Sequence, residues 1–265
     1  MNFNFKKKFG QNFLTDKNLL AAIVDDSGID ENAVVLEIGP GAGALTQAIA
    51  KKAARVVSFE IDKELESVLE ENLKDFSNVK VIFKDFMKLS DDEIKAEVGE
   101  NYHVIANLPY YITSPILFRF FEAECKPKSL TIMVQKEYGE RLTASPNTSE
   151  YSSLSVLSRW LGEGKIVRKV PAQMFTPPPK VDSCIVHYEF SDIRFDKDTS
   201  KFIRNCFAMR RKTLVNNLSL AYNTGKDILK AILESNGISP AARSEELSTE
   251  QILKLYDSMK SALHF

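Results

Sequence analysis

Short apolar runs alternate with helix-like segments between residues 33 and 135. Most residues in these runs are β-branched or aromatic, as in buried parallel strands. The runs occupy residues 34–36, 56–59, 79–83, 104–106 and 130–134. Between the second and third runs, Leu65, Val68, Leu69 and Leu73 follow the spacing of one helix face. The alternation predicts βαβ units, and therefore an α/β fold whose parallel sheet carries helices on both faces.

The pattern changes after residue 180. Residues 184–190 predict one more strand, and the segments that follow have the apolar spacing of helices, separated by glycine and proline. Their apolar positions are Phe202, Cys206 and Met209; Leu214, Leu218 and Ala221; Ile228, Ile232 and Leu233; and Ile252, Leu253 and Tyr256. We therefore expect one domain over residues 1–193 and a small all-helical domain over residues 194–265.

The composition is that of an ordinary globular protein, since 44% of the 265 residues are hydrophobic and 27% are charged. No stretch reaches the roughly 18 consecutive apolar residues of a membrane span. No apolar run follows the N-terminal lysines as it would in a secretory signal. Cys125, Cys184 and Cys206 are far apart, which argues against a disulfide framework and a thiolate metal site. We expect a cytoplasmic protein without a bound metal, and a monomer as the default.

Charge is unevenly distributed, although the formal net charge is only −1. Residues 60–100 contain 13 acidic and 6 basic side chains, whereas residues 194–212 contain 7 basic and 2 acidic ones. Lys6, Lys7 and Lys8 form a second basic cluster. Mixed charge is common on solvated helices, but this asymmetry is also expected of a protein that turns one face toward a polyanion. It favours nucleic acid as a partner only modestly.

A glycine-rich turn follows the first predicted strand. Gly39, Gly41 and Gly43 lie between that strand and a helix-like segment at residues 45–51, a setting in which backbone approaches a nucleotide-type ligand closely. Glu37 stands two residues before the first glycine. Its carboxylate would repel a pyrophosphate but tolerates an ammonium and a sulfonium. The charge therefore favours S-adenosylmethionine over a dinucleotide.

Two further carboxylates follow successive predicted strands. Glu60 closes the second strand, at the place expected of an acid that accepts hydrogen bonds from ribose hydroxyls. Asp85 follows the third strand and is placed to accept from an adenine amino group. Each acid alone is more often a solvated surface residue. Because ligands of open α/β sheets bind at the carboxyl ends of the strands, the acids together predict a cofactor site there.

The fourth predicted strand runs into Asn107, Leu108, Pro109 and Tyr110. An adenine N6 lone pair is delocalised into the ring, so two hydrogen-bond acceptors would help the amine to act as a nucleophile. The Asn107 side-chain oxygen and the Leu108 carbonyl are candidates for these acceptors. Pro109 would stiffen the turn, and Tyr110 would stack against an extruded base. A proline turn beside core tyrosines is the plainer interpretation, but the position after the fourth strand favours a methyl-acceptor site.

Five sequence blocks occur in order over nearly the whole chain. They are KFGQNFL at residues 8–14, EIGPGAGALT at 37–46, NLPYYITSPI at 107–116, VP with FTPPPKVDS between 170 and 183, and RRKTL at 210–214. The set resembles the ribosomal RNA adenine N6,N6-dimethyltransferases, especially their bacterial small-subunit branch. This resemblance implies a Rossmann-like methyltransferase that uses S-adenosylmethionine. It also implies dimethylation of N6 of two adjacent adenosines in the 3′-terminal hairpin of 16S rRNA, during ribosome biogenesis on the small subunit.

The resemblance further implies roles for individual residues. The cofactor-binding residues would be Gln11, Asn12 and Leu14 from a covering segment at residues 1–20, with Glu37, Gly39, Gly41, Glu60, Asp85 and Asn107. Tyr110 and Phe175 would sandwich the target base, although Phe175 is otherwise interpreted as a core aromatic before a proline-rich turn. The RNA-binding residues would be Lys6, Lys7, Lys8, Arg204, Arg210, Arg211 and Lys212. Their phosphate contacts would weaken with salt, whereas the plainer interpretation is a solvated helix face.

Three alternatives stay open. A large-subunit rRNA methyltransferase of the macrolide-resistance type is disfavoured by residues 177–183 and 107–116. The protein could instead act chiefly as a ribosome-assembly or nucleic-acid-binding factor, for which methylation would be dispensable. The presence of Glu37, Asn107 and Tyr110 favours catalysis, but one protein can have both roles. A nicotinamide-dependent oxidoreductase is disfavoured by Glu37 and by the lack of an evident hydride-transfer site.

Overall fold

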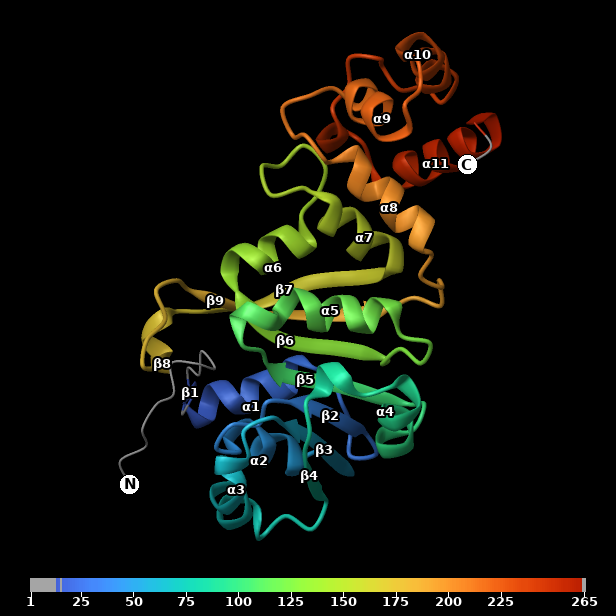
Figure 1. The fold of residues 1–265 in the computed structure, drawn as a ribbon. Coiled ribbons are helices and arrows are strands. Elements are labelled where there is room, and N and C mark those ends of the chain that lie inside the picture. The colour runs from blue at the N-terminus through green and yellow to red at the C-terminus, as the bar shows by residue number, and fades with distance from the viewer. Residues whose placement is uncertain (1–12, 15, 264–265) are drawn as a thin grey trace. The chain divides into compact units, whose positions relative to one another are not determined.

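A seven-stranded sheet is the main sheet of the computed structural model, which describes residues 13, 14 and 16–263. The strand order is β4-β3-β2-β5-β6-β9-β7 (Figure 1). The strands are β2 (Val34–Ile38), β3 (Arg55–Glu60), β4 (Val79–Phe83), β5 (Tyr102–Asn107), β6 (Ser129–Gln135), β7 (Gly162–Val170) and β9 (Ser183–Phe190). The predicted α/β fold is confirmed, and all six predicted strands are present.

The sheet is parallel from β4 to β6, and β9 pairs antiparallel with β6. The chain winds outward from β2, which has β3 on one side and β5 on the other. In such sheets the ligand crevice lies at the carboxyl ends of the strands, beside this change of direction. β7 was not predicted, because its sequence GEGKIVRKV alternates exposed and partly buried residues at the edge of the sheet and lacks a continuous apolar run.

Helices cover both faces of the sheet (Figure 1). On one face lie α1 (Lys17–Asp26), α2 (Ala44–Ala50) and α3 (Glu66–Leu73), and on the other α4 (Asp91–Val98) and α5 (Thr113–Glu122). Ile23 of α1 and Ile49 of α2 are buried in one cluster with Val56 of β3. On the opposite face, Phe121 of α5 packs against Tyr188 of β9 with ring centroids 5.7 Å apart. The central strands are therefore buried on both sides, which explains their continuous apolar runs.

A small second sheet joins two distant parts of the sequence. β1 (Phe13–Leu14) pairs antiparallel with β8 (Phe175–Thr176), and Leu14 lies opposite Phe175. Both of these side chains are buried in the same cluster as Ile23. The pairing joins residues 13 and 14, shortly before α1, to residues 175 and 176.

The chain divides into two compact units, and the division is discontinuous. One contains residues 1–139 and 163–191, and the other contains residues 140–162 and 192–265. The sequence-based boundary at residue 193 differs, because residues 140–162 group with the C-terminal helices. The rings of Trp160 and Phe195 lie 6.0 Å apart, and the Tyr151 hydroxyl donates to the Leu247 carbonyl at 3.0 Å.

The helical unit has the four C-terminal helices that were predicted. Its helices include α7 (Ser153–Leu161), α8 (Lys197–Cys206), α9 (Leu214–Tyr222), α10 (Lys226–Ser235) and α11 (Thr249–Leu263), while α6 (Lys136–Thr143) straddles the division. In α10 the buried face differs from the predicted one, because Leu229 is buried whereas Ile228, which was predicted to face the core, is 54% exposed. Met209 lies beyond the end of α8. Among the described residues, none of the helices is long and apolar enough to cross a bilayer.

Candidate active site

A large cleft opens at the carboxyl ends of β2, β3, β4 and β5. Its empty volume is about 1350 Å³, including the part open to solvent. This is the edge at which open α/β sheets bind their ligands. The cleft brings together ten of the residues that the sequence singled out: Leu14, Glu37, Gly39, Gly41, Glu60, Asp85, Asn107, Leu108, Pro109 and Tyr110.

The glycine turn after β2 forms the floor of the cleft. Gly39, Gly41 and Gly43 all have positive φ, at 69°, 59° and 85°, which side chains disfavour. Gly39 N–H donates to the Phe59 carbonyl at 2.9 Å, which ties the turn to the end of β3. A Cβ at Gly43 would lie 3.3 Å from Leu69 of α3. The backbone conformation therefore favours glycine at all three positions, and the packing against α3 adds to this preference at Gly43.

Glu37 is buried beneath this turn, with 1% of its surface exposed. One carboxylate oxygen accepts hydrogen bonds from the hydroxyls of Thr46 and Ser58, each at 2.7 Å. Burial raises the pKa of Glu37 to about 7, against the lowering effect of these two hydroxyls. The carboxyl group is therefore poised to titrate near neutral pH.

Glu60 connects the end of β3 to the glycine turn. Oε2 accepts from Gly41 N–H at 3.2 Å, while Oε1 accepts from Ile61 N–H at 2.8 Å and Asp62 N–H at 2.9 Å. Burial raises the pKa of Glu60, and these backbone donors oppose that rise. A carboxylate offers about four acceptor positions, so three backbone contacts leave little room for two hydroxyls. At least one backbone contact must lengthen if Glu60 accepts from both hydroxyls of a ribose.

Asp85 begins the loop that follows β4 and lines the same cleft. Its Oδ1 accepts from Met87 N–H at 3.0 Å, which caps the 3-10 turn η3 (Phe86–Lys88). Its Oδ2 lies 3.8 Å from Lys88 Nζ. The side chain therefore shapes its own loop as well as facing the cleft.

The turn after β5 forms the opposite rim. The Leu108 N–H donates to the Met133 carbonyl at 3.3 Å, and the Pro109 carbonyl accepts from Ile112 N–H at 3.0 Å. The Tyr110 hydroxyl lies 2.7 Å from the Ser183 hydroxyl, at the start of β9. Burial raises the pKa of Tyr110, so this phenol stays neutral, and the contact with Ser183 ties its ring to the start of β9. Asn107 is the last residue of β5 and is placed at the rim by the strand itself.

Phe175 is not among the residues that line the cleft. It is 2% exposed and lies in the core cluster, opposite Leu14 in the β1–β8 pair. Gln11, Asn12, Lys6, Lys7 and Lys8 fall outside the described residues. The cleft residues that the sequence did not single out include Ile61, Phe86 and Tyr111. Ile61 and Tyr111 are 52% and 62% exposed, and each directly follows a residue chosen for its chemistry.

The remaining expected RNA-binding residues lie in the helical unit. Arg204 is exposed on α8, and Arg210, Arg211 and Lys212 are exposed in the turn before α9. Asn217, which is 2% exposed, shapes this turn from below. Its side chain accepts from Met209 N–H at 3.1 Å and donates to the Cys206 carbonyl at 2.7 Å. A buried amide thus fixes the backbone from which the three cations project.

The family follows from comparison with known proteins. The family model described as "Ribosomal RNA adenine dimethylase" matches residues 2–261. The chain belongs to this family. A curated relative from Bacillus mycoides, "Ribosomal RNA small subunit methyltransferase A", is 44% identical over 271 residues, covering 97% of this chain and 92% of the relative. A relative of the same name from Bacillus cereus is 43% identical with the same coverage.

Two solved structures of rRNA or adenosine methyltransferases share the fold, each at 27% identity over 94% of this chain. The 23S rRNA methyltransferase ErmE aligns with a TM-score of 0.73 over 100% of its own chain. A dimethyladenosine transferase from Plasmodium falciparum aligns with a TM-score of 0.78 over 98% of its chain. Membership of the family makes the chain an rRNA adenine dimethyltransferase that uses S-adenosylmethionine. The cleft fits this donor, because it combines a glycine turn, apolar walls and acids suited to a cation and to hydroxyls.

Proposed function

We propose that the protein dimethylates N6 of two adjacent adenosines in the 3′-terminal hairpin of 16S rRNA, on small ribosomal subunits in the cytoplasm, and that it does so as a monomer. The name of the Bacillus relatives, at 43–44% identity, supports the small subunit as the substrate. The observation that carries the proposal is the cleft itself, in which Glu60 and Asp85 share one cavity with Asn107 and Tyr110.

Each part of the cleft has a role in this reaction. Glu60 would hold the ribose hydroxyls and Asp85 the adenine amine of the donor, and the bound donor supplies an activated methyl group. Asn107 Oδ1 and the Leu108 carbonyl would accept the two N6 hydrogens of the target, and Tyr110 would stack on its ring. Positioning of the amine against the methyl group supplies most of the rate enhancement. A role for Phe175 on the other face of the base would require its movement out of the core.

The test is mass spectrometry of rRNA after purified, undermethylated small subunits are incubated with the protein and S-adenosylmethionine. We expect two adjacent dimethyladenosines in the 3′-terminal hairpin. An unmodified hairpin under conditions in which the donor binds would contradict the proposal.

A large-subunit target is the second candidate, since ErmE, a 23S rRNA methyltransferase, shares the fold at a TM-score of 0.73. Incubating the same protein with protein-free large-subunit rRNA distinguishes the two. Primer-extension stops in that rRNA, without modification of the small subunit, would favour this candidate.

Donor binding should depend on pH through Glu37. Its pKa is about 7, so the carboxyl group loses its charge as the pH falls through neutrality. The attraction for a cationic donor is then lost, and the dissociation constant should rise by up to about tenfold per pH unit below pH 7. Calorimetric titrations between pH 5.5 and 8.5 measure this dependence. Glu37→Gln should bind more weakly at pH 8 and with a flatter pH profile, and an equally steep profile in that variant would assign the titration to another group.

The basic turn of the helical unit should contribute phosphate contacts. Replacing Arg210, Arg211 and Lys212 with Ala should reduce the slope of log K against log salt for RNA binding by about 2–3, since each phosphate contact contributes about 0.7–0.9. The matched control replaces Lys226, Lys230 and Lys254, which are exposed on α10 and α11, and should change the slope less. Equal effects of the two triple variants would indicate non-specific attraction.

A further inference from the structure

The loop that follows β4 forms one wall of the cleft but has little regular structure of its own. Lys84, Asp85 and Phe86 line the cavity, and the only helical part is the three-residue turn η3. Its amides are held by short-range contacts: Met87 N–H donates to Asp85 Oδ1, and Lys88 N–H donates to the Asp85 carbonyl. Such local contacts do not fix the loop against the rest of the sheet unit.

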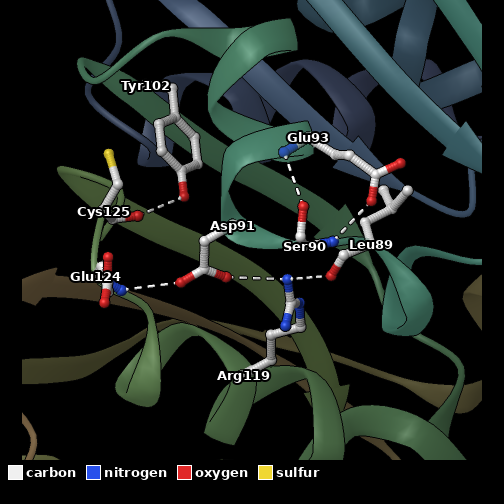
Figure 2. Close-up of polar contacts among 8 residues, drawn as sticks. All are labelled: Leu89, Ser90, Asp91, Glu93, Tyr102, Arg119, Glu124 and Cys125. Atoms are coloured by element: carbon white, nitrogen blue, oxygen red, sulfur yellow. Dashed lines mark hydrogen bonds and ion pairs between the residues drawn. The ribbon is translucent and has the colours of Figure 1, made fainter.

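Arg119 of α5 supplies contacts of longer range to this loop. Figure 2 shows its guanidinium between the end of the loop and the start of α4. Nη2 donates to the Leu89 carbonyl at 2.6 Å and to Asp91 Oδ1 at 3.0 Å. One guanidinium nitrogen therefore joins the last residues of the loop to the first residue of α4.

Phe86 is held by the same side chain. The Arg119 guanidinium carbon lies 5.7 Å from the centroid of the Phe86 ring, within the range of a cation–π contact. The Phe86 ring also packs against Phe59 of β3 at 5.8 Å and Phe120 of α5 at 5.6 Å. Phe59 and Phe86 both line the cleft, so Arg119 supports this wall from behind.

The end of α5 is itself fixed in place. Asp91 Oδ2 accepts from Glu124 N–H at 3.0 Å, and the Tyr102 hydroxyl donates to the Cys125 carbonyl at 3.1 Å (Figure 2). These contacts join the C-terminal end of α5 to α4 and to the start of β5. The N-terminal end of α5 begins at Thr113, directly after the turn that carries Asn107 and Tyr110. One helix thus connects the methyl-acceptor turn with the loop of Asp85.

Stability alone does not explain the ion pair between Arg119 and Asp91. The Arg119 side chain is only 19% exposed, and its Nε–H is buried without a hydrogen-bond partner among the described residues, which costs free energy. Replacing both partners of a buried ion pair with apolar residues is often neutral for stability, whereas removing one partner can leave a costly unpaired charge. Asp91 is 32% exposed in its side chain and would remain solvated after the replacement. An apolar side chain at position 119 would not donate hydrogen bonds to Leu89 and Asp91, so it would not hold the loop in its conformation.

We propose that Arg119 is a positioning residue for the donor: by holding Phe86, Leu89 and Asp91, it keeps the Asp85 loop in the conformation that receives the adenine end of S-adenosylmethionine. The inference rests on the proposed donor site. Arg119 itself does not line the cleft, and it acts through Phe86 and the backbone of the loop.

The test compares Arg119→Met with a matched variant, Arg168→Met. Arg168 forms a bidentate pair with Asp26, at 2.8 and 3.1 Å, in the same unit but without a contact to the Asp85 loop. In the protein without donor, amide hydrogen exchange at Lys88 and Leu89 should become faster in Arg119→Met only. Calorimetry should show a dissociation constant for S-adenosylhomocysteine that is about 3- to 30-fold higher. The donor KM should rise with kcat at saturation nearly unchanged, and urea midpoints report stability for both variants.

Several results would overturn the positioning role of Arg119. Unchanged exchange at Lys88 and Leu89, or unchanged affinity for S-adenosylhomocysteine, would overturn the proposal, as would equal losses of affinity in Arg119→Met and Arg168→Met. Failure of the wild-type protein to bind S-adenosylmethionine would refute the proposed function instead. In that case the exchange measurement still decides whether Arg119 holds the loop.

Discussion

Asn107→Ala should reduce methyl transfer by about 10²–10³-fold or more, while leaving the affinity for RNA nearly unchanged. The side-chain oxygen would accept a hydrogen of the target amine as the amine becomes tetrahedral, and removal of one such preorganised hydrogen-bonding group typically has an effect of this size. Single-turnover kinetics with saturating donor and RNA measure the chemical step directly.

Asn101→Ala provides the matched control, because Asn101 is exposed just before β5, at the opposite end of that strand from Asn107. Donor affinity is measured separately for Asn107→Ala, since Asn107 also lines the donor cleft. Turnover of Asn107→Ala within a few-fold of wild type would exclude it as the acceptor.

Glu60→Gln should weaken S-adenosylmethionine binding by about 10- to 100-fold. Hydrogen bonds to a charged group contribute about 1.5–3 kcal/mol each, and a neutral amide loses that charge. The amide nitrogen of Gln cannot accept, so the variant keeps either the contact with Gly41 N–H or the contacts with Ile61 and Asp62 N–H, and the glycine turn should loosen as well. Equilibrium titration of the donor measures the effect.

Glu66→Gln, which changes an exposed carboxylate at the start of α3, controls for the loss of one negative charge near the cleft. If Glu60→Gln and Glu66→Gln bind the donor equally well, Glu60 has no place at the ribose.

The sequence predicted those parts of the fold that depend on local pattern. β2, β3, β5 and β6 are buried on both faces, and a continuous apolar run is the direct consequence of that burial. β7, β1 and β8 were not predicted, because an edge strand of mixed polarity and two strands of two residues depend on their partners.

The sequence predicted where the candidate site lies in the fold, but not the hydrogen bonds that its side chains make. Glu37, Glu60, Asp85 and Asn107 follow or close successive strands, and parallel strands bring their carboxyl ends to one edge. The pattern does not reveal that Glu60 already accepts three backbone hydrogen bonds, or that Arg119 contacts a carbonyl 30 residues earlier. Such contacts depend on side-chain directions that only the folded chain defines.

The chain passes between its two units at residues 139–140, 162–163 and 191–192. A fragment that stopped at residue 193 would retain Trp160 and Tyr151 but lose Phe195 and Leu247, their partners within the helical unit. Such a fragment would expose the apolar surfaces of Trp160 and Tyr151 to water, and it should therefore aggregate. Chimaeras that borrow the helical unit from another family member must therefore exchange two segments at once, because a single crossover point cannot transfer this unit intact.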